Sequence, residues 1–398
     1  MLILREFTNR ETSFSVLKVQ AKILKVLLYF LLFAGIAELA CRIDDHMRYG
    51  TNLLEPVLTA DSLKISDLTT SGVEFKRGKP FARYRTWVLN EHGFRSQPFE
   101  KEKTTGRPRV MVLGASESFG FAESPGKPFA DRLEMELKRD FQIVNASIIG
   151  MPLWAMAPYW ENWLADFDPD IVIVVASPLF YLSNHTPSSQ IKSIDPSSNN
   201  PKNTPSKYHW LEPASFSSIL ENSRFIDRLK NKLEIPQPIA AYRQRKRAEQ
   251  QVKLHGPDWV ITVLPEDRVA LYRNHLVHLI DKIQSKGGKV ILTTCPIIAN
   301  GPNRPNDQKH WLSDQEKRSK FTNEVKWKFL EACRQAVLEI GHLKQIPVLD
   351  LWEKMTGEER FFYDLNHFSD LGSEFVAERI ISQIRKTTIG QSERQLAE

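Results

Sequence analysis

Short, mostly apolar runs recur along this chain after its first hundred residues. They cover residues 109–113, 142–146, 170–176, 289–294 and 346–350. A run that is apolar on both faces of an extended chain is typical of a strand buried in a parallel sheet. We therefore expect these runs to form the strands of one parallel sheet.

The segments between the runs have helical spacing. In residues 128–139, for example, Phe129, Leu133 and Leu137 fall on one helical face. The other predicted helices cover residues 152–167, 266–286, 320–340 and 371–386. Strands that alternate with helices in this way predict an α/β fold, with helices covering both sides of the sheet.

An insertion interrupts the pattern between residues 183 and 260. Residues 183–207 are rich in Ser, Asn, Pro and Lys, and predict a mobile loop. The rest is mixed and contains the basic run 243–247, which we interpret as a solvated helix face. Because the sheet pattern is incomplete on either side, this is an insertion into one domain that spans residues 106–390.

The most apolar stretch of the chain lies near its beginning, at residues 23–41. Its charge-free core, 26–37, is short for a bilayer, which needs about 20 residues. Lys25 can snorkel at one interface, and Glu38 lies within a turn of Arg42 at the other. We expect a transmembrane anchor at 23–41, followed by a loosely structured juxtamembrane lead-in at 42–105.

The charges before this stretch predict its orientation. Residues 1–22 are predominantly basic, which places this N-terminal segment in the cytoplasm and the rest of the chain outside. Three alternatives stay open: a signal peptide cleaved after the small residues at 35–37, a lipoprotein signal ending at Cys41, and a buried helix. Glu38 is unfavourable for the lipoprotein signal, and only the buried helix would leave the domain unexported.

Composition narrows the class of protein. Of the 398 residues, 41% are hydrophobic and 26% charged, which excludes a wholly disordered chain and allows a sizeable core. The net charge of +6 is concentrated in the N-terminus and the run 243–247, and no nucleic-acid-binding pattern accompanies it. We expect no nucleic-acid partner.

No metal or cofactor is expected either. The three cysteines have no metal-ligand spacing, and Cys295 and Cys333 lie in core segments, where free thiols are expected. His275 and His278 are spaced for one helical face, but no carboxylate or cysteine completes a metal set.

The first motif that carries chemistry is Gly-Ala-Ser-Glu-Ser-Phe-Gly at residues 114–120, directly after the first strand. Ser116 is thereby placed at the carboxyl end of a parallel strand, where open α/β sheets bind ligands. The motif fits neither the dinucleotide-binding GxGxxG pattern nor the GxSxG elbow. On its own, it is equally explained as a tight strand–helix connection.

The second motif is Asp364-Leu-Asn-His367, after the last strand and before the last helix. A hydroxyl needs a base to become a good nucleophile, and a neutral imidazole suits that task near pH 7. A carboxylate on the other ring nitrogen fixes the tautomer and stabilises the imidazolium. Alone, the motif is better explained as a surface turn.

Together, the two motifs resemble the SGNH/GDSL hydrolases, in which Ser follows the first strand and Asp and His lie close together near the end. Residues 90–95, Asn-Glu-His-Gly-Phe-Arg, are similar to the lead-in of membrane-tethered bacterial members. Residues 144–150 resemble the second block of the family, and 362–372 the last. The resemblance covers residues 88–180 and 345–385, about half of the chain.

The resemblance implies a flavodoxin-like three-layer α/β/α domain and specific roles. Ser116 would be the nucleophile, His367 the general base, and Asp364 the residue that orients it. The N–H groups of Ser116 and Gly150 would form part of the oxyanion hole. One departure is tolerable, since Ala115 replaces an aspartate that transfers no proton.

A more serious departure lies in the third block, where the family has an Asn that donates to the oxyanion. This chain has Pro178 at that position. Ser177 and Asn184 are the candidates to replace this donor. Losing one such donor can lower a rate by about 10²–10³.

These observations predict a membrane-anchored serine esterase or acyltransferase at the bacterial inner membrane, with its catalytic domain in the periplasm. By analogy alone, its substrate is an acetyl-like ester, in particular an acylated glycan of the envelope or an exported polysaccharide. One alternative is a catalytically weak or inactive module that binds glycans during assembly, which the missing donor favours. A nucleotide-binding domain is a second alternative, but it leaves Asp364 and His367 unexplained.

Overall fold

The structure of this chain is a computed structural model. It describes residues 3–49, 53–54, 60–68, 74–84, 86–103, 106–184, 223–232, 237–304, 310–311 and 315–395. The chain divides into two compact units: Met1–Leu58 with Pro205–Ile235, and Thr59–Thr204 with Pro236–Glu398. Residues 185–207 of the expected mobile loop lie outside the described part.

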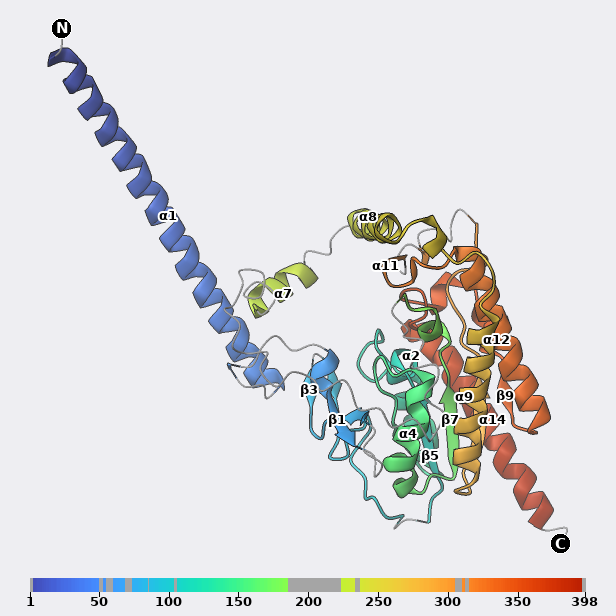
Figure 1. Ribbon diagram of the computed structural model, residues 1–398. Coiled ribbons are helices and arrows are strands. Elements are labelled where there is room, and N and C mark those ends of the chain that lie inside the picture. Colours follow the sequence, from blue (N-terminus) through green and yellow to red (C-terminus); the bar gives the residue numbers. More distant parts are fainter. Residues whose placement is uncertain are drawn as a thin grey trace. The chain divides into compact units, whose positions relative to one another are not determined.

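The second unit is built around a five-stranded parallel sheet in the order β6-β5-β7-β8-β9. Its strands are β5 (Arg109–Gly114), β6 (Gln142–Asn145), β7 (Ile171–Val175), β8 (Lys289–Thr293) and β9 (Val348–Leu349). All five coincide with the predicted runs, and numbered along the chain their order is 2-1-3-4-5. That is the flavodoxin-like order. Figure 1 shows β5 and β7 inside this sheet.

Helices cover both faces of the sheet. The helices of this unit are α2 (Ser116–Phe119), α3 (Phe129–Leu137), α4 (Leu153–Asn162), α8 (Gln237–His255), α9 (Glu266–Gln284), α11 (Gln315–Arg318), α12 (Asn323–Leu343), α13 (Leu351–Met355) and α14 (Asp370–Gln395). Short 3-10 turns lie at Ala60–Leu63, Leu164–Phe167, Leu179–Leu182, Pro257–Trp259 and Glu359–Phe361. The five predicted helices are therefore confirmed, and their first residues shift by at most three positions. The helix predicted at 152–167 is divided into α4 and the 3-10 turn Leu164–Phe167, and α14 continues beyond the predicted end at 386 to Gln395.

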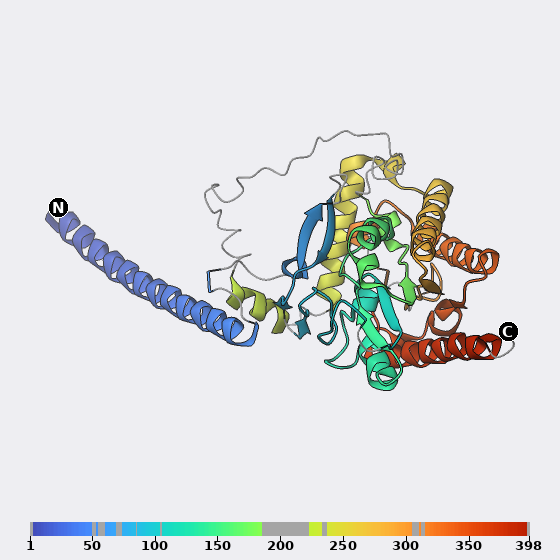
Figure 2. The same ribbon diagram turned by 90° about the horizontal axis from the view of Figure 1, so that it is seen from below.

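Alternate residues of β5 contribute to two separate cores. Met111 and Leu113 pack with α4, α9 and α12, whereas Val110 and Val112 pack with α3, α13 and α14. The strand is apolar from Val110 to Leu113 because both of its faces are covered, which gives the three-layer α/β/α arrangement. Figure 2 shows α14, in red, alongside the blue-green α3.

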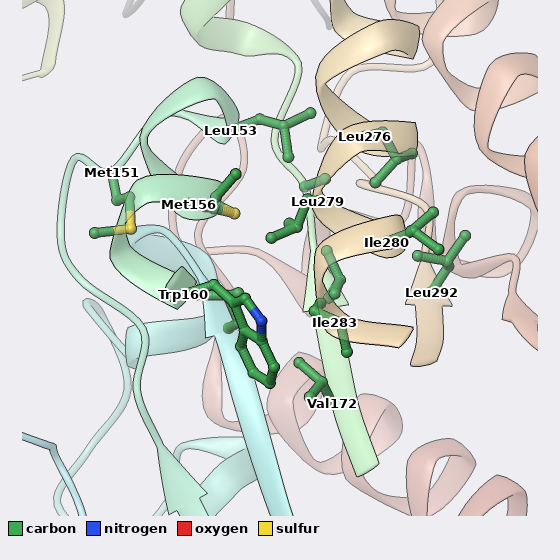
Figure 3. Packing of buried hydrophobic residues seen from close by; sticks show 14 of the residues in the cluster. Met151, Leu153, Met156, Trp160, Val172, Leu276, Leu279, Ile280, Ile283 and Leu292 are labelled. Carbon is green, nitrogen blue, oxygen red and sulfur yellow. The ribbon is translucent and has the colours of Figure 1, made fainter. Parts of the chain in front are cut away.

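The core on the α4 side joins segments that are distant in the sequence. Figure 3 shows Trp160 of α4 next to α9, with Ile283 and Val172 close to its ring. The Trp160 indole N–H also donates a 3.1 Å hydrogen bond to the Lys282 carbonyl oxygen. The aromatic ring thus fixes the spacing between the two helices on this face.

Part of the juxtamembrane lead-in is more ordered than expected. It contains two antiparallel pairs, β1 (Lys64–Leu68) with β2 (Glu74–Gly78) and β3 (Arg83–Tyr84) with β4 (Trp87–Val88). Phe75 and Phe94 are buried in the core on the α4 side. The expectation of loose structure was wrong here because each strand is too short, and too polar on one face, to give a periodic signal.

The first unit contains α1 (Ile3–Tyr49) and α7 (Arg224–Lys232). Within α1, residues Gln20–Met47 are apolar and long enough to cross a bilayer, although a signal sequence has the same properties. Phe33 contacts Phe225 of α7, with ring centroids 6.3 Å apart. The insertion predicted at 183–260 is therefore divided, since α7 belongs with the apolar helix and α8 with the sheet.

Candidate active site

The candidate nucleophile Ser116 is the first residue of α2, at the carboxyl end of β5. A glycine is required two residues before it, because a Cβ atom at Gly114 would lie 2.3 Å from Ser118 Oγ and 2.8 Å from the Val175 carbonyl oxygen. The chain therefore turns sharply between strand and helix, close against β7. This turn places the Ser116 side chain at the edge of the sheet where ligands bind in open α/β folds.

His367 lies within hydrogen-bonding distance of Ser116. The distance from His367 Nε2 to Ser116 Oγ is 2.8 Å. On the other side of the ring, His367 Nδ1 is 2.8 Å and 2.7 Å from the two carboxylate oxygens of Asp364. In the neutral imidazole, the Nδ1–H donates to the Asp364 carboxylate. Nε2 is then free of a proton and can accept the one from the Ser116 hydroxyl.

The loop that carries this pair is held by its own backbone. Asp364 Oδ1 accepts hydrogen bonds from the N–H groups of Asn366 at 3.2 Å and His367 at 3.0 Å. The Tyr363 N–H donates to the His367 carbonyl oxygen at 2.8 Å, and the Phe121 ring lies 4.6 Å from the imidazole. A local turn therefore brings Asp364 and His367 together, which is why their spacing was visible in the sequence.

The electrostatics of the pair favour an imidazolium beside a carboxylate. Burial works against protonation of His367, but the hydrogen bond and charge of Asp364, together with the charges of Glu117 and Glu123, raise its pKa above the usual value. Burial likewise opposes ionisation of Asp364. The hydrogen bond and charge of His367 prevail, so the pKa of Asp364 is lowered.

The end of α2 is braced by two side chains whose role the sequence did not reveal. Arg95 Nη1 donates to the carbonyl oxygens of Phe119, at 2.8 Å, and of Gly120. Asn145 Nδ2, at the end of β6, donates to the Ser118 carbonyl oxygen at 3.1 Å. These bonds satisfy carbonyl groups that a short helix leaves without partners.

Arg95 is 7% exposed, and burial lowers its pKa despite the charges of Asp131 and Glu123. The sequence contains only weak signals of these hydrogen bonds. Arg95 belongs to the segment 90–95 that resembles the family, but the resemblance gives it no role, and Asn145 is a polar residue in a mostly apolar run.

The expected oxyanion donors are the N–H groups of Ser116 and Gly150. Gly150 has a φ of +74°, a conformation that favours glycine. The segment before it leaves the sheet beside the nucleophile turn, since the Ile148 N–H donates to the Gly114 carbonyl oxygen at 3.1 Å. The oxyanion role of the Ser116 and Gly150 N–H groups stays a prediction.

Asn184 is occupied elsewhere and does not replace the missing donor of the third block. Its Nδ2 donates to Ser319 Oγ at 3.0 Å, and its Oδ1 accepts the Lys320 N–H at 2.9 Å. Both hydrogen-bonding functions of this amide thus hold the segment that precedes α12. Ser177 is buried and follows β7, beside Pro178.

A narrow pocket adjoins the Ser116–His367 pair. It has a volume of about 290 Å³ including its open mouth. Its lining is formed by Glu117, Val175, Ser177, Pro178, Leu179, Cys295, Pro296, Ile297, Leu330, Asn366 and Phe368. Glu117 follows the candidate nucleophile and lies 3.3 Å from its Oγ, and Asn366 and Phe368 flank His367 in the chain.

His275 has a structural role. Its Nδ1 lies 2.6 Å from the Tyr181 hydroxyl, and burial, with a smaller effect of His278, lowers its pKa to about 4. Cys295 and Cys333 are free thiols, as expected. Within the part of the chain that the structure describes, no cluster of three or more His, Cys, Asp or Glu side chains is arranged to hold a metal ion.

No protein-family model matches the chain, and no curated protein sequence matches it. Similar solved structures include a lipase/acylhydrolase from Enterococcus faecalis, with 16% identity, 70% of this chain and 96% of that chain covered, and a TM-score of 0.39. An acetyl xylan esterase is 12% identical, with 69% of this chain and 99% of that chain covered and a TM-score of 0.39. The psychrotrophic esterase EstA from Pseudoalteromonas is 11% identical, with 70% of this chain and 98% of that chain covered and a TM-score of 0.37.

The similar structures are consistently described as acylhydrolases, lipases and esterases, among them GDSL-like lipases. The atoms of the site carry the functional proposal.

Proposed function

We propose that this chain is a membrane-anchored serine hydrolase or acyltransferase of the SGNH/GDSL kind, acting on acyl esters. The observation that carries the proposal is the continuous hydrogen-bonded chain from Ser116 Oγ through His367 to Asp364, with distances of 2.8 and 2.7 Å. These three side chains come from the two ends of the domain, and each has the chemistry that its position requires.

In the proposed reaction, Ser116 Oγ attacks the ester carbonyl while His367 Nε2 accepts its proton. Asp364 stabilises the imidazolium that forms, and the N–H groups of Ser116 and Gly150 donate to the developing oxyanion. His367 then returns the proton to the departing alcohol, which leaves a seryl ester. Water completes hydrolysis, or a hydroxyl group of an acceptor completes transfer, with His367 again accepting the proton.

The apolar helix supports an anchored form of the protein. Residues Gln20–Met47 have the length and hydropathy of a membrane span, and the basic residues before it favour a cytoplasmic N-terminus. The catalytic unit would then work on the periplasmic side of the inner membrane. Acylated glycans of the envelope, or exported polysaccharides, are the ester substrates that such a location offers.

A second candidate function is a glycan-binding module with little or no catalysis. Pro178 favours it, because a proline side chain carries no hydrogen-bond donor and stands where the family has an Asn that donates to the oxyanion. Asn184 does not compensate for that loss, since its amide bonds Ser319 and Lys320. A weakly active enzyme and a binding module differ in whether Ser116 reacts, which a direct chemical test measures.

The decisive experiment is covalent labelling of the purified full-length protein by a fluorophosphonate, combined with hydrolysis of a short-chain aryl ester. We expect labelling of the wild type, and loss of both labelling and turnover in Ser116→Ala. Ser118→Ala is the matched control, because Ser118 is a neighbouring buried serine whose hydroxyl donates to the Ala115 carbonyl oxygen. It should retain labelling.

Equal ester hydrolysis by wild type and Ser116→Ala would rule out Ser116 as the nucleophile. If the folded wild type shows neither labelling nor esterase activity, the non-catalytic function becomes the better account.

A further inference from the structure

The carboxylate of Glu117 is exceptional among the groups that line the pocket beside Ser116. Most of the lining is apolar, with side chains such as Val175, Leu179 and Ile297. Glu117 belongs to the same wall and is only 4% exposed. A buried carboxylate is costly unless it is paired, so its presence in an apolar wall calls for a partner.

Glu117 has only part of its hydrogen-bonding capacity filled. Its Oε2 lies 3.3 Å from Ser116 Oγ. Its Oε1 is buried and has no hydrogen-bond partner among the residues that the structure describes. Each carboxylate oxygen can accept two hydrogen bonds, so Glu117 can accept another donor without losing the contact to Ser116.

Arg318 provides a positive charge in the neighbourhood but not the missing hydrogen bond. The charge of Glu117 acts on Arg318, while Arg318 Nε donates to the Leu179 carbonyl oxygen at 2.8 Å. The two charges therefore compensate each other partly at a distance. Glu117 Oε1 therefore remains an unfilled acceptor position in the buried pocket wall.

The pocket is small. Its enclosed part has room for about one water-sized group. In a seryl ester, the acyl carbon is bonded to Ser116 Oγ, which lies 3.3 Å from the Glu117 carboxylate. A substituent on the carbon next to the carbonyl is therefore within reach of Glu117, whereas a long acyl chain exceeds the enclosed space.

We propose that this pocket selects a small acyl group that carries a hydrogen-bond donor, a hydroxyl or an ammonium, on the carbon next to the carbonyl. Glu117 would be the residue that recognises it. The inference rests on the proposed function, since it requires that Ser116 accept an acyl group. It deepens that function by naming the class of acyl group, and it excludes acidic acyl groups, which the carboxylate would repel.

The test compares three aryl esters of nearly equal size: the 4-nitrophenyl esters of propionate, glycolate and glycine. Their acyl groups end in a methyl, a hydroxyl and an ammonium group, respectively. For each ester, kcat/KM is divided by the rate of hydrolysis by hydroxide, which removes intrinsic reactivity. We expect at least one of the two donor-bearing esters to exceed propionate by about tenfold or more.

Variants of Glu117 distinguish a hydroxyl donor from an ammonium donor. Glu117→Gln keeps the size and an acceptor oxygen but loses the charge, so it should abolish a preference for glycine and only weaken one for glycolate. Glu117→Met removes both the charge and the acceptor oxygen, so it should abolish a preference for either ester. Glu136→Gln, at an exposed position on α3, is the control and should retain the wild-type ratios.

The outcomes distinguish this inference from the proposed function. Hydrolysis that depends on Ser116, with equal corrected rates for all three esters in the wild type, would overturn the acyl selectivity and leave the esterase intact. The same conclusion follows if Glu117→Met retains the wild-type preference. If the wild type neither hydrolyses any of the esters nor reacts with a fluorophosphonate, both proposals fail.

Discussion

Glu38 accepts a hydrogen bond from the backbone N–H of Phe225, with 2.9 Å between Glu38 Oε2 and the nitrogen. The same carboxylate accepts the Arg224 N–H at 3.2 Å and the Ser223 hydroxyl at 2.8 Å. A carboxylate within the apolar helix α1 thus caps the N-terminus of α7, which is far away in the sequence. Such caps satisfy N–H groups that a helix cannot bond internally.

The cap leads to a prediction about local stability. Replacing Glu38 by Ala should destabilise α7 by about 1 kcal/mol, the usual cost of losing a cap. Hydrogen exchange of the backbone N–H groups in 225–229 should then be about fivefold faster in the membrane-reconstituted protein. Glu249→Ala is the control, because Glu249 pairs with Arg245 and Lys246 on α8. Unchanged exchange in Glu38→Ala would show that the cap adds nothing to α7.

A second prediction concerns the pH dependence of ester hydrolysis. Neutral His367 is the active base, and the raised pKa means that protonation, with loss of activity, begins at a higher pH than for an exposed histidine. The acidic limb of kcat/KM should therefore have an apparent pKa above the usual 6.5. In Asp364→Asn the hydrogen bond to a charge is lost, so the limb should move to lower pH while kcat falls. A limb that stays in place would contradict the assigned role of Asp364.

The three proposed catalytic residues should differ in residual activity. Ser116→Ala and His367→Ala should reduce turnover to background, because nucleophile and base act as a unit. Asp364→Ala should retain more activity than either, since Asp364 orients the imidazole but does not bond to the substrate. The measurement is kcat with a short-chain aryl ester, and an Asp364 variant as inactive as Ser116→Ala would contradict the ranking.

A fourth prediction separates Asn184 from the oxyanion hole. Its amide holds Ser319 and Lys320, so Asn184→Ala should change kcat by much less than the 10² or more expected on removal of an oxyanion donor. A decrease of about 10² in kcat, with the Tm unchanged, would instead assign it to the oxyanion hole.

His275 should make the fold sensitive to mild acid. Its folded-state pKa of about 4 lies below the 6.5 of an exposed histidine, so the unfolded chain binds a proton first as the pH falls. The stability associated with His275 is therefore complete above pH 6.5 and is lost between 6.5 and 4. His275→Gln retains an acceptor for Tyr181 and should lower the difference in Tm between pH 7 and pH 5. An equal difference in wild type and variant would exclude this effect.

Much of the fold, and the proximity of the three main residues of the candidate site, could be predicted from the sequence for a physical reason. Strands buried on both faces must be apolar throughout, so all five were visible as runs. Asp364 and His367 belong to one turn, and Ser116 follows a strand end that the sheet fixes in space. Local patterns therefore specified these three residues.

The contacts that escaped prediction depend on tertiary structure. Arg95 and Asn145 reach the carbonyl groups of α2 only because the register of β5 with β6 and the path of the lead-in bring them there. The sequence places Glu117 in the connection between strand and helix at 114–120 and says no more about it. Neither the burial of this side chain nor its nearness to the pocket has a sequence signature. The packing of α7 against α1 joins segments that share no periodic pattern.

The ordered lead-in has a practical consequence for anyone who wishes to prepare the second unit without the apolar helix α1. Cutting the chain at residue 106 would remove Phe75 and Phe94 from the core and Arg95 from the carbonyl groups of Phe119 and Gly120, close to Ser116. A secreted form should instead begin near Thr59, where the second unit begins. Such a form would leave α7 without Glu38 and Phe33, so the intervening segment Pro205–Ile235 should be deleted together with the anchor.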